Sequence, residues 1–226
     1  MRVLVFDTET TGLPRTKLLT PEVVSLWPHV VQLSYVMYDV SDNAITNIRD
    51  FIVKIPQEIE ITSESIALHG ITKEISHENG EPIEEVLVRF IYDFSHADLI
   101  VGHNLTFDMN MLKIELMREI QQKSDEKDLF LAFLEELKTS RKYYCTMLSS
   151  INLCNLSAVN KKGNPYTKFP KLSELHEKLF QRNPKNLHNS LHDVLICLRC
   201  YYMLEYKKDL LRTNREMRYL FREMKL

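Results

Sequence analysis

Several features that would assign a chain to a special class are scarce or missing in this sequence. Glycine occurs 5 times in 226 residues and no segment has low complexity, which excludes a fibrous or disordered chain. No stretch approaches the roughly 18 apolar residues of a membrane span, and the first apolar run is too short for a signal peptide. We therefore expect an intracellular, cytoplasmic, soluble protein without membrane contact.

Cysteine is also rare, and its spacing carries little information. The 4 cysteines lack the paired spacing of a disulfide framework or a zinc knuckle. Cys197 and Cys200 are close, but they fall inside a helical pattern and no second pair matches them. Cys145 and Cys154 stand in apolar surroundings. Buried thiols are the favoured interpretation, ahead of a zinc site.

A large net charge is missing as well, since the formal charge is −2. The charge is nevertheless uneven along the chain. Residues 161–226 carry 15 Lys and Arg against 7 Asp and Glu, which leaves 14 against 24 for residues 1–160. A basic final third can bind a polyanion, and an acidic remainder can hold metal ions. Ordinary solvated helix faces are an equally good explanation of the charge alone.

Apolar runs predict a sheet that is built from five strands. Residues 3–6 form a continuous apolar run, which is typical of a strand buried on both faces. Residues 30–38 and 45–55 are rich in β-branched and aromatic side chains, and turn residues 39–43 separate them. These three segments predict an antiparallel meander. Residues 99–101 and 143–146 predict a fourth and a fifth strand.

Helical spacing of apolar residues predicts helices at 82–97, 107–122, 172–180 and 190–206, and a helical stretch within residues 124–142. Residues 155–171 are polar and contain Pro and Gly, so we predict one long loop there, a kind of segment that is often functional. This order indicates an α/β fold with a mixed sheet. The length suits one domain, residues 1–206, followed by a basic C-terminal helix in residues 207–226 that packs on it or extends from it.

Two acids follow the first predicted strand. Asp7 and Glu9 are two residues apart, so they project from the same face if the strand persists through Glu9. Two anions this close repel each other, and they need a cation or a proton. Residues 10–13 then form a glycine-containing turn that a ligand can approach closely. Solvated acids at a strand end remain the simpler alternative for this pair alone.

Two further acids lie at predicted helix starts. Asp108 opens the helix after the fourth strand, where the helix dipole alone favours an acid. Asp193 follows Ser190 by three residues, as in a capping box. If Ser190 is the N-cap, His188 lies ahead of the helix and can lean toward whatever Asp193 faces, whereas His192 sits about 100° around the helix from Asp193. Each acid keeps a structural alternative, and His188 is favoured over His192 as a catalytic histidine.

Taken together, these segments form an ordered set that resembles a known family. The chain is similar to the DEDD exonucleases of the histidine-bearing (DEDDh) branch, and in two further segments to bacterial proofreading exonucleases of the epsilon type. The matching segments are FDTETTGL (residues 6–13), HNLTFD (103–108), HNSLHD (188–193), HGIT (69–72) and TM (146–147). The chain departs from the family at Cys145, where Asp is frequent, and at Ser190, where Ala is frequent. Nothing after Tyr206 resembles the polymerase-binding extension of proofreading subunits.

The resemblance implies a ribonuclease H-like fold, a mixed five-stranded sheet flanked by helices, and a 3′-to-5′ exonuclease that releases nucleoside 5′-monophosphates. Asp7, Glu9, Asp108 and Asp193 would hold two Mg²⁺ or Mn²⁺ ions, with Asp7 bridging both, to stabilise the attacking and leaving oxygens. His188 would be the general base toward the attacking water. An ordinary histidine pKa of about 6.5 then predicts weak activity at acid pH.

The resemblance also implies contacts to the 3′-terminal nucleotide and a class of partner. Thr10, Thr11 and Leu13 would meet the terminal sugar and base, with Leu13 as an apolar wedge. His69 and Asn104 are further candidates. The expected partner is a nucleic acid with a free 3′ end, single-stranded or frayed, in proofreading or repair, with no polymerase or repair partner identified.

Three alternatives stay open. An exoribonuclease shares the same chemistry, because hydrolysis at a 3′ end does not require reading the 2′ position. A catalytically silent nucleic-acid binding module is disfavoured, since all four acids and the histidine are present. A binding role for the basic tail is compatible with catalysis. We expect DNA as the polymer.

Overall fold

The computed structural model of the chain describes residues 1–138 and 142–226. Its centre is a five-stranded sheet with the order β3-β2-β1-β4-β5. β1 is antiparallel to β2 and β2 to β3, whereas β4 is parallel to β1 and to β5. The predicted meander and the mixed five-stranded sheet are therefore confirmed. The strands are β1 (Arg2–Thr10), β2 (Val30–Asp39), β3 (Ala44–Ile52), β4 (Leu99–Gly102) and β5 (Tyr143–Cys145).

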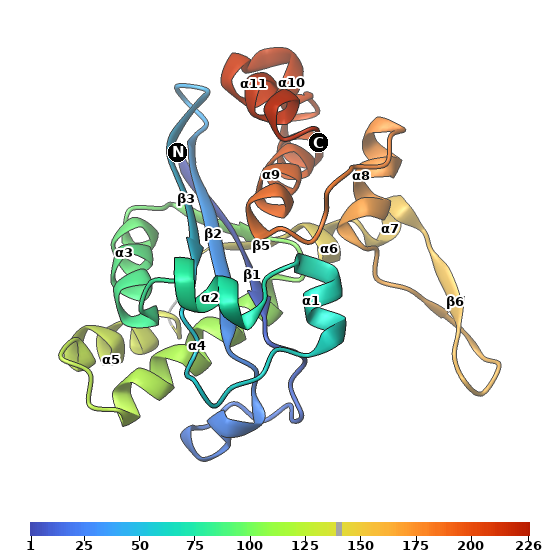
Figure 1. Cartoon of the computed structure of the whole chain (residues 1–226). Coiled ribbons are helices and arrows are strands. Elements are labelled where there is room, and N and C mark those ends of the chain that lie inside the picture. Colours follow the sequence, from blue (N-terminus) through green and yellow to red (C-terminus); the bar gives the residue numbers. More distant parts are fainter. Residues whose placement is uncertain (139–141) are drawn as a thin grey trace.

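Helices cover both faces of the sheet because β1 is apolar on both sides. Leu4 and Phe6 point into one core, while Val3 and Val5 point into the other. Helices α3, α4 and α5 line the first core, and α9 lies across the second with α8, α10 and α11 (Figure 1). These helices are α3 (Ile83–Ser95), α4 (Leu105–Gln121), α5 (Lys127–Glu136), α8 (Leu172–Phe180), α9 (Ser190–Tyr206), α10 (Leu210–Thr213) and α11 (Arg215–Glu223).

Smaller elements lie at the margins of the sheet. A third apolar cluster, around Ile55, Ile61 and Ile71, packs against the short helices α1 and α2. The hydroxyl groups of Thr62 and Thr72 cap these two helices. The bounds are η1 (Pro21–Leu26), α1 (Ser63–His69), α2 (Lys73–Asn79), α6 (Thr146–Ser149), α7 (Ile151–Cys154), β6 (Ser157–Val159) and β7 (Pro165–Thr167).

The predicted elements differ from the structure at several places. β1 continues to Thr10, well past its apolar run, because its second half still pairs with β2. The strand predicted at 45–55 ends at Ile52, and the helix predicted at 107–122 begins at Leu105. Residues 155–171 were predicted as a loop but contain the β6–β7 hairpin, and α1 and α2 were not predicted. The helical stretch predicted within 124–142 is α5, and residues 139–141 of that segment lie outside the described residues.

The cysteines are free thiols, and Cys154, Cys197 and Cys200 are buried as predicted, while Cys145 is partly exposed. The tail contributes to the second core, since Leu210 from α10 packs there. The domain boundary at residue 206 stays a prediction. Within the described part of the chain, no helix combines the length and apolar character that a membrane crossing needs.

Candidate active site

The end of β1 places two acids on one side of the sheet. Asp7 and Glu9 alternate in register with Val3 and Val5, so they face the layer that α9 forms. Asp193 lies in the first turn of α9. The packing of α9 on β1 therefore brings a third carboxylate to the two acids on the strand.

The fourth acid comes from the opposite layer. Asp108 lies in the first turn of α4 and is only 2% exposed. Its Oδ1 accepts two hydrogen bonds from Thr8, one from the backbone N at 3.0 Å and one from Oγ1 at 2.7 Å. Thr8 points toward α4 because it alternates with Asp7 along β1. The two helical layers thus meet at the end of this strand.

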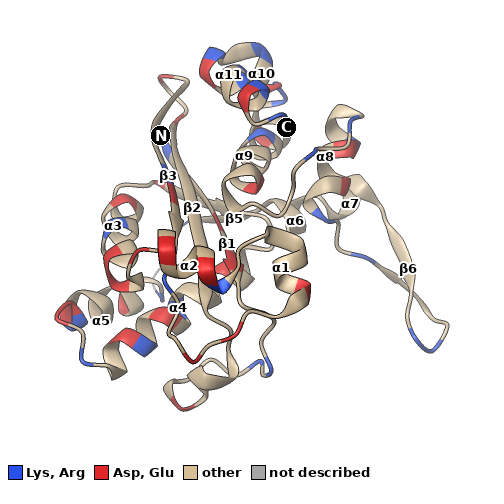
Figure 2. Ribbon diagram, in the orientation of Figure 1, with Lys and Arg blue, Asp and Glu red and all other residues tan. Residues whose placement is uncertain are grey.

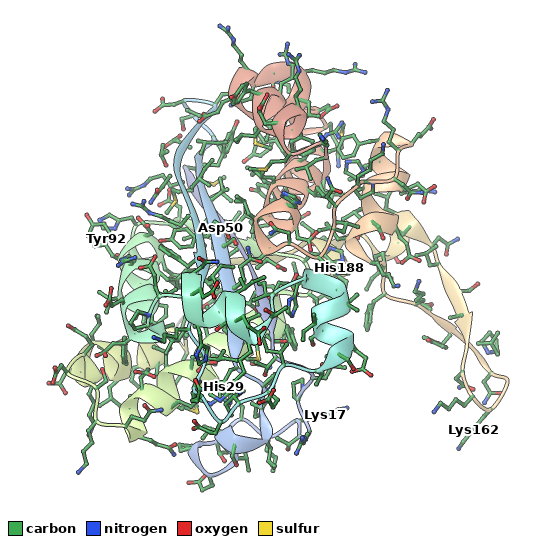
Figure 3. All side chains as sticks on the ribbon, viewed as in Figure 1. Lys17, His29, Asp50, Tyr92, Lys162 and His188 are labelled. Carbon is green, nitrogen blue, oxygen red and sulfur yellow. The ribbon has the colours of Figure 1, made fainter. Side chains whose placement is uncertain are left out.

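A cleft of about 710 Å³ connects the four acids and opens to solvent. It also contains His188, which lies on the loop ahead of α9 (Figure 3). Leu13 and Asn104, two of the expected substrate contacts, line the same cleft. Its remaining lining residues are Thr8, His103, Phe107, Met147, Phe169, Pro170, Lys171, Leu172, Ser173 and Leu187.

His188 is held in an unusual backbone conformation. Its φ is 68°, in the left-handed region that only a few per cent of non-glycine residues adopt. Its backbone N–H donates to Asp193 Oδ2 at 3.2 Å. Ligand atoms of Glu9, His188 and Asp193 lie within 4.8 Å of one another. Strain of this kind persists where the surroundings fix it, often at functional sites.

The neighbouring His192 points elsewhere. Its Nδ1 is 2.8 Å from the carbonyl oxygen of Asn186, so this ring ties the loop to the helix, and it does not line the cleft. The capping box that was the structural alternative for Asp193 does not form: Asn189 is the N-cap, and its side chain accepts from His192 N at 3.3 Å. Ser190 is instead the first helical residue. Its hydroxyl donates to the carbonyl oxygen of Asp7 at 2.7 Å, which anchors α9 on β1.

The electrostatics of the four acids are those of an uncompensated anionic cluster. Burial, followed by the charges of Asp108, Asp193 and Glu9, raises the pKa of Asp7 well above its ordinary value. Burial likewise raises the pKa of Glu9 to about 8, and the pKa values of Asp108 and Asp193 to about 7.

These residues fit a divalent metal centre. Asp193 Oδ1 is buried and has no hydrogen-bond partner within the described residues. A buried, unpaired carboxylate oxygen is costly, and a cation removes that cost. Carboxylate oxygens are hard ligands, which Mg²⁺ and Mn²⁺ prefer. The acids of the cleft also outnumber its basic side chains, so a divalent cation would balance their charge.

The raised pKa values predict a pH-dependent stability in the absence of metal. Because the folded-state pKa values are raised, the stability that these acids contribute is complete below about pH 4 and is lost as the pH rises through about 7 to 8. In EDTA, we expect Tm to fall between about pH 5 and pH 8.5 by roughly 4 °C more in the wild type than in Glu9→Gln. Thermal unfolding with and without Mg²⁺ measures this. Equal pH slopes in the two proteins would contradict it.

A polar chain that the sequence pattern did not predict supports the site from the next strands. Asp50 on β3 accepts hydrogen bonds from Gln32 Nε2 and Ser34 Oγ on β2, both at 2.7 Å. Gln32 Oε1 accepts from the backbone N of Ser190 at 3.1 Å. Ser34 and Gln32 lie opposite Asp7 and Glu9 in the sheet. These hydrogen bonds therefore fix the first residue of α9 over the acids of β1. No local pattern indicates it, because its members are distant in sequence.

A second cavity of about 430 Å³ adjoins the cleft and holds other expected substrate contacts. Thr10, Leu13 and His69 line it, and Leu13, which is 82% exposed, lines both cavities. Phe107 also lines both, although the sequence pattern assigned it no role. An exposed Leu and a Phe at the boundary between two cavities can hold a planar base between apolar surfaces.

Two of the expected substrate residues are engaged with the backbone. Thr11 does not line either cavity: its hydroxyl accepts from the backbone N of His29 at 3.0 Å and it is buried. Its side chain holds the turn against β2, and the expectation that Thr11 meets the substrate stays a prediction. His69 Nδ1 accepts from Ile71 N at 3.1 Å, so its Nε2 donates to the carbonyl oxygen of Thr10 at 3.2 Å. His69 thus shapes the cavity through β1.

His103 is a further residue whose position only the structure gives. Its ring lies 3.0 Å from Thr146 Oγ1 and 3.0 Å from the carbonyl oxygen of Pro170. Burial lowers its pKa to about 4, so it stays neutral at physiological pH. It ties the segment with Phe169 and Lys171 to the rim of the cleft. The length of the polar segment at 155–171 was the signal that pointed to this region.

Comparisons with known proteins show what this chain is similar to. DNA polymerase III subunit epsilon from Buchnera aphidicola (subspecies Acyrthosiphon pisum, strain APS) is 23% identical over 223 residues, which cover 96% of this chain and 78% of that protein. E. coli exonuclease I in complex with a dT13 oligonucleotide matches with a TM-score of 0.61 and 17% identity, over 97% of this chain and 43% of that one. Exonuclease X in complex with 5′-overhanging duplex DNA matches with a TM-score of 0.50 and 19% identity, over 94% and 92%.

The chain spans less than half the length of the exonuclease I chains that it matches. The structural likeness confirms the ribonuclease H-like fold expected from the sequence. The model of the RNase_T exonuclease family matches residues 4–201, which include all four acids and His188. The chain therefore belongs to the RNase_T exonuclease family.

Proposed function

We propose that this chain is a metal-dependent 3′-to-5′ exonuclease that releases nucleoside 5′-monophosphates from DNA 3′ ends. The observation that carries the proposal is the convergence of four carboxylates and one histidine in an open cleft, with Asp193 Oδ1 buried and unpaired among the described residues. Family membership supports hydrolysis of a nucleic acid. The epsilon relative and the oligonucleotide-bound neighbours support DNA.

We assign the four acids to the binding of two Mg²⁺ or Mn²⁺ ions. When bound, these ions supply stabilisation for the charge that builds on the attacking and leaving oxygens. Asp7 is the candidate for a shared ligand, because it lies on β1 where α9 and α4 meet, with Ser190 bonded to its carbonyl oxygen and Asp108 bonded to the adjacent Thr8. Thr8 fixes Asp108 through two hydrogen bonds, and the backbone of His188 fixes Asp193 through one. Each of these bonds leaves the second carboxylate oxygen free for an ion.

His188 is assigned as the general base. It is exposed at the cleft, and its side chain lies beside Glu9 and Asp193. In this role a ring nitrogen accepts the proton of the attacking water and releases it to solvent.

The terminal nucleotide is assigned to the boundary between the two cavities. Leu13 and Phe107 line both and would contact the 3′-terminal base, with Thr10 and Asn104 as polar neighbours. Placing the last phosphate over the acids while the base fills the adjoining cavity would require a free end. This explains why an exonuclease, and not an endonuclease, fits the site.

A side-by-side digest tests the proposal. Single strands of DNA and RNA with the same sequence, and a DNA duplex with a mispaired 3′ end, each labelled at the 5′ end, are incubated in Mg²⁺. We expect ladders that shorten from the 3′ end on DNA, mononucleotide products, and no cleavage in EDTA. If RNA is shortened faster than DNA, the substrate is RNA and not DNA. Internal cuts, or no cleavage of any strand in Mg²⁺ or Mn²⁺, would refute the proposal.

A further inference from the structure

The β6–β7 hairpin, residues 155–171, is an arm that projects from the body of the molecule (Figure 1). Its strands pair Ser157 with Thr167 and Val159 with Pro165. The backbone of Lys168 donates to the carbonyl oxygen of Leu156 at 3.0 Å and closes the base of the arm. The arm therefore has a defined backbone although it projects away from the sheet.

The tip of the arm is an ordered turn that displays two lysines. Asn160 Oδ1 accepts from the backbone N of Lys162 at 2.9 Å and of Asn164 at 3.1 Å, and Gly163 has a φ of 83°. Lys161 and Lys162 sit in this turn and are exposed. Figure 3 shows Lys162 at the extremity of the arm, far from His188.

The charge of the arm has one sign. Residues 155–171 contain four lysines and no acid, and the arm is blue at its tip (Figure 2). Lys168 is paired with Glu174 on α8, at the base of the arm. The two lysines at the tip lie well beyond that pair. A run of exposed lysines without acids attracts a polyanion.

The arm also exposes apolar side chains, which is unusual for a two-stranded ribbon. Val159 is 67%, Tyr166 50% and Phe169 55% exposed. Aromatic rings interleaved with lysines are the arrangement that binds single-stranded nucleic acids, because every base has a face that can stack and every nucleotide carries a phosphate.

The base of the arm is continuous with the active site. Phe169 and Lys171 line the cleft that holds the four acids, while Tyr166 and Lys162 lie farther out along the same segment. A strand whose 3′ end lies over the acids would leave the cleft past Phe169 and meet the arm. This continuity indicates that the molecule on the arm is the substrate strand. The charge of the arm and its exposed rings would not indicate this by themselves.

We propose that the β6–β7 arm binds the single-stranded part of the substrate upstream of its 3′ end, with Tyr166 stacking on a base and Lys161 and Lys162 contacting phosphates. The inference rests on the proposed function, because the occupant is the substrate strand itself. From its base to its tip the arm spans roughly 17 Å, at about 3.4 Å per residue. At about 3.4 Å per stacked nucleotide, the tip is reached only by strands of more than about five nucleotides. A trinucleotide fills the cleft and leaves the arm unoccupied.

The test compares a 15-nucleotide and a 3-nucleotide thymidine strand, each labelled at the 5′ end. Fluorescence anisotropy measures binding in an Asp7→Asn background, so that the strand is not consumed. For the long strand we expect Lys161→Ala/Lys162→Ala to reduce the slope of log affinity against log salt by about 1.4, at about 0.7 for each phosphate that a lysine no longer neutralises. Tyr166→Ala should weaken binding of the long strand about fivefold or more. Binding of the short strand should not change.

A matched control removes the same charge elsewhere. Lys127 is the first residue of α5 and Lys138 follows the end of that helix at Glu136. Helix α5 lies across the molecule from the arm (Figure 1), and Lys127→Ala/Lys138→Ala should leave both measurements unchanged. Unaltered Tm of the arm variants shows that the fold is kept. In the otherwise wild-type enzyme, the arm variants should lower kcat/KM for the long strand and not for the trinucleotide.

The outcomes separate this inference from the proposed function. If the wild type hydrolyses neither strand, the proposed function fails, while length-dependent binding still reports on the arm. If both arm variants bind the long strand with wild-type affinity and salt slope, the arm proposal is overturned. Equal losses for both strands would overturn it as well, since they would place the effect in the cleft.

Discussion

Asp7→Asn should abolish hydrolysis while leaving the fold intact. Asp7 lies on β1 where α9 and α4 meet, so its neutral amide removes the carboxylate that we assign to both ions. Loss of several kcal/mol of transition-state stabilisation corresponds to a decrease in kcat of at least about 10³-fold. Quantifying mononucleotide release from a labelled DNA strand in Mg²⁺ gives this factor.

The same substitution has an opposite effect on the metal-free protein. Asp7 is crowded by three like charges at the end of a buried strand, and an amide relieves that repulsion. We expect the Tm of Asp7→Asn in EDTA to equal or exceed that of the wild type, with a smaller increase on adding Mg²⁺. If an Asp7→Asn preparation free of native enzyme has wild-type turnover, Asp7 is not part of the active site.

His188→Ala should lower kcat by about 10² to 10⁴-fold, the usual contribution of a general base. His192→Ala is the matched control, because this second histidine lies four residues on and faces Asn186 instead of the cleft. It should lower kcat far less. If His192→Ala proves the more damaging substitution, the assignment of the base is wrong.

The metal dependence of His188→Ala separates two roles for this residue. Its side chain lies near ligand atoms of Glu9 and Asp193, so a metal-ligand role makes a distinct prediction. Loss of a ligand would raise the Mg²⁺ concentration that gives half-maximal activity. Loss of a base leaves that concentration unchanged and flattens the acid limb of the pH profile of kcat. We expect the second result.

Much of the fold and the identity of the candidate site residues could be predicted from the sequence. The apolar run of β1 and the helical spacing in α3, α4 and α9 are local patterns, and burial of an apolar face requires them. The acids were recognised by their order along the chain. That Asp7 and Glu9 share a face follows from strand alternation, once β1 is known to continue to Thr10.

The sequence did not indicate the hydrogen bonds that side chains form with backbone groups distant in the sequence. Ser190 looked like a helix cap, but its hydroxyl reaches the backbone of Asp7, 183 residues away. Thr11 stays an expected substrate contact, and only the structure shows that its hydroxyl accepts from the backbone N of His29. In both cases a buried hydroxyl group has to find a hydrogen-bond partner, and only the packed structure decides which partner lies within reach.

By itself, the sequence determined which chemical groups are available: four carboxylates, one well-placed histidine, a mixed α/β sheet and a basic final third. The tertiary structure decided how they are used. Packing α9 and α4 on opposite faces of β1 gathers the acids, which raises the pKa of each of them. It also turned a polar segment into an arm beside the cleft. Burial and distance set these electrostatic effects, and neither quantity exists until the chain is folded.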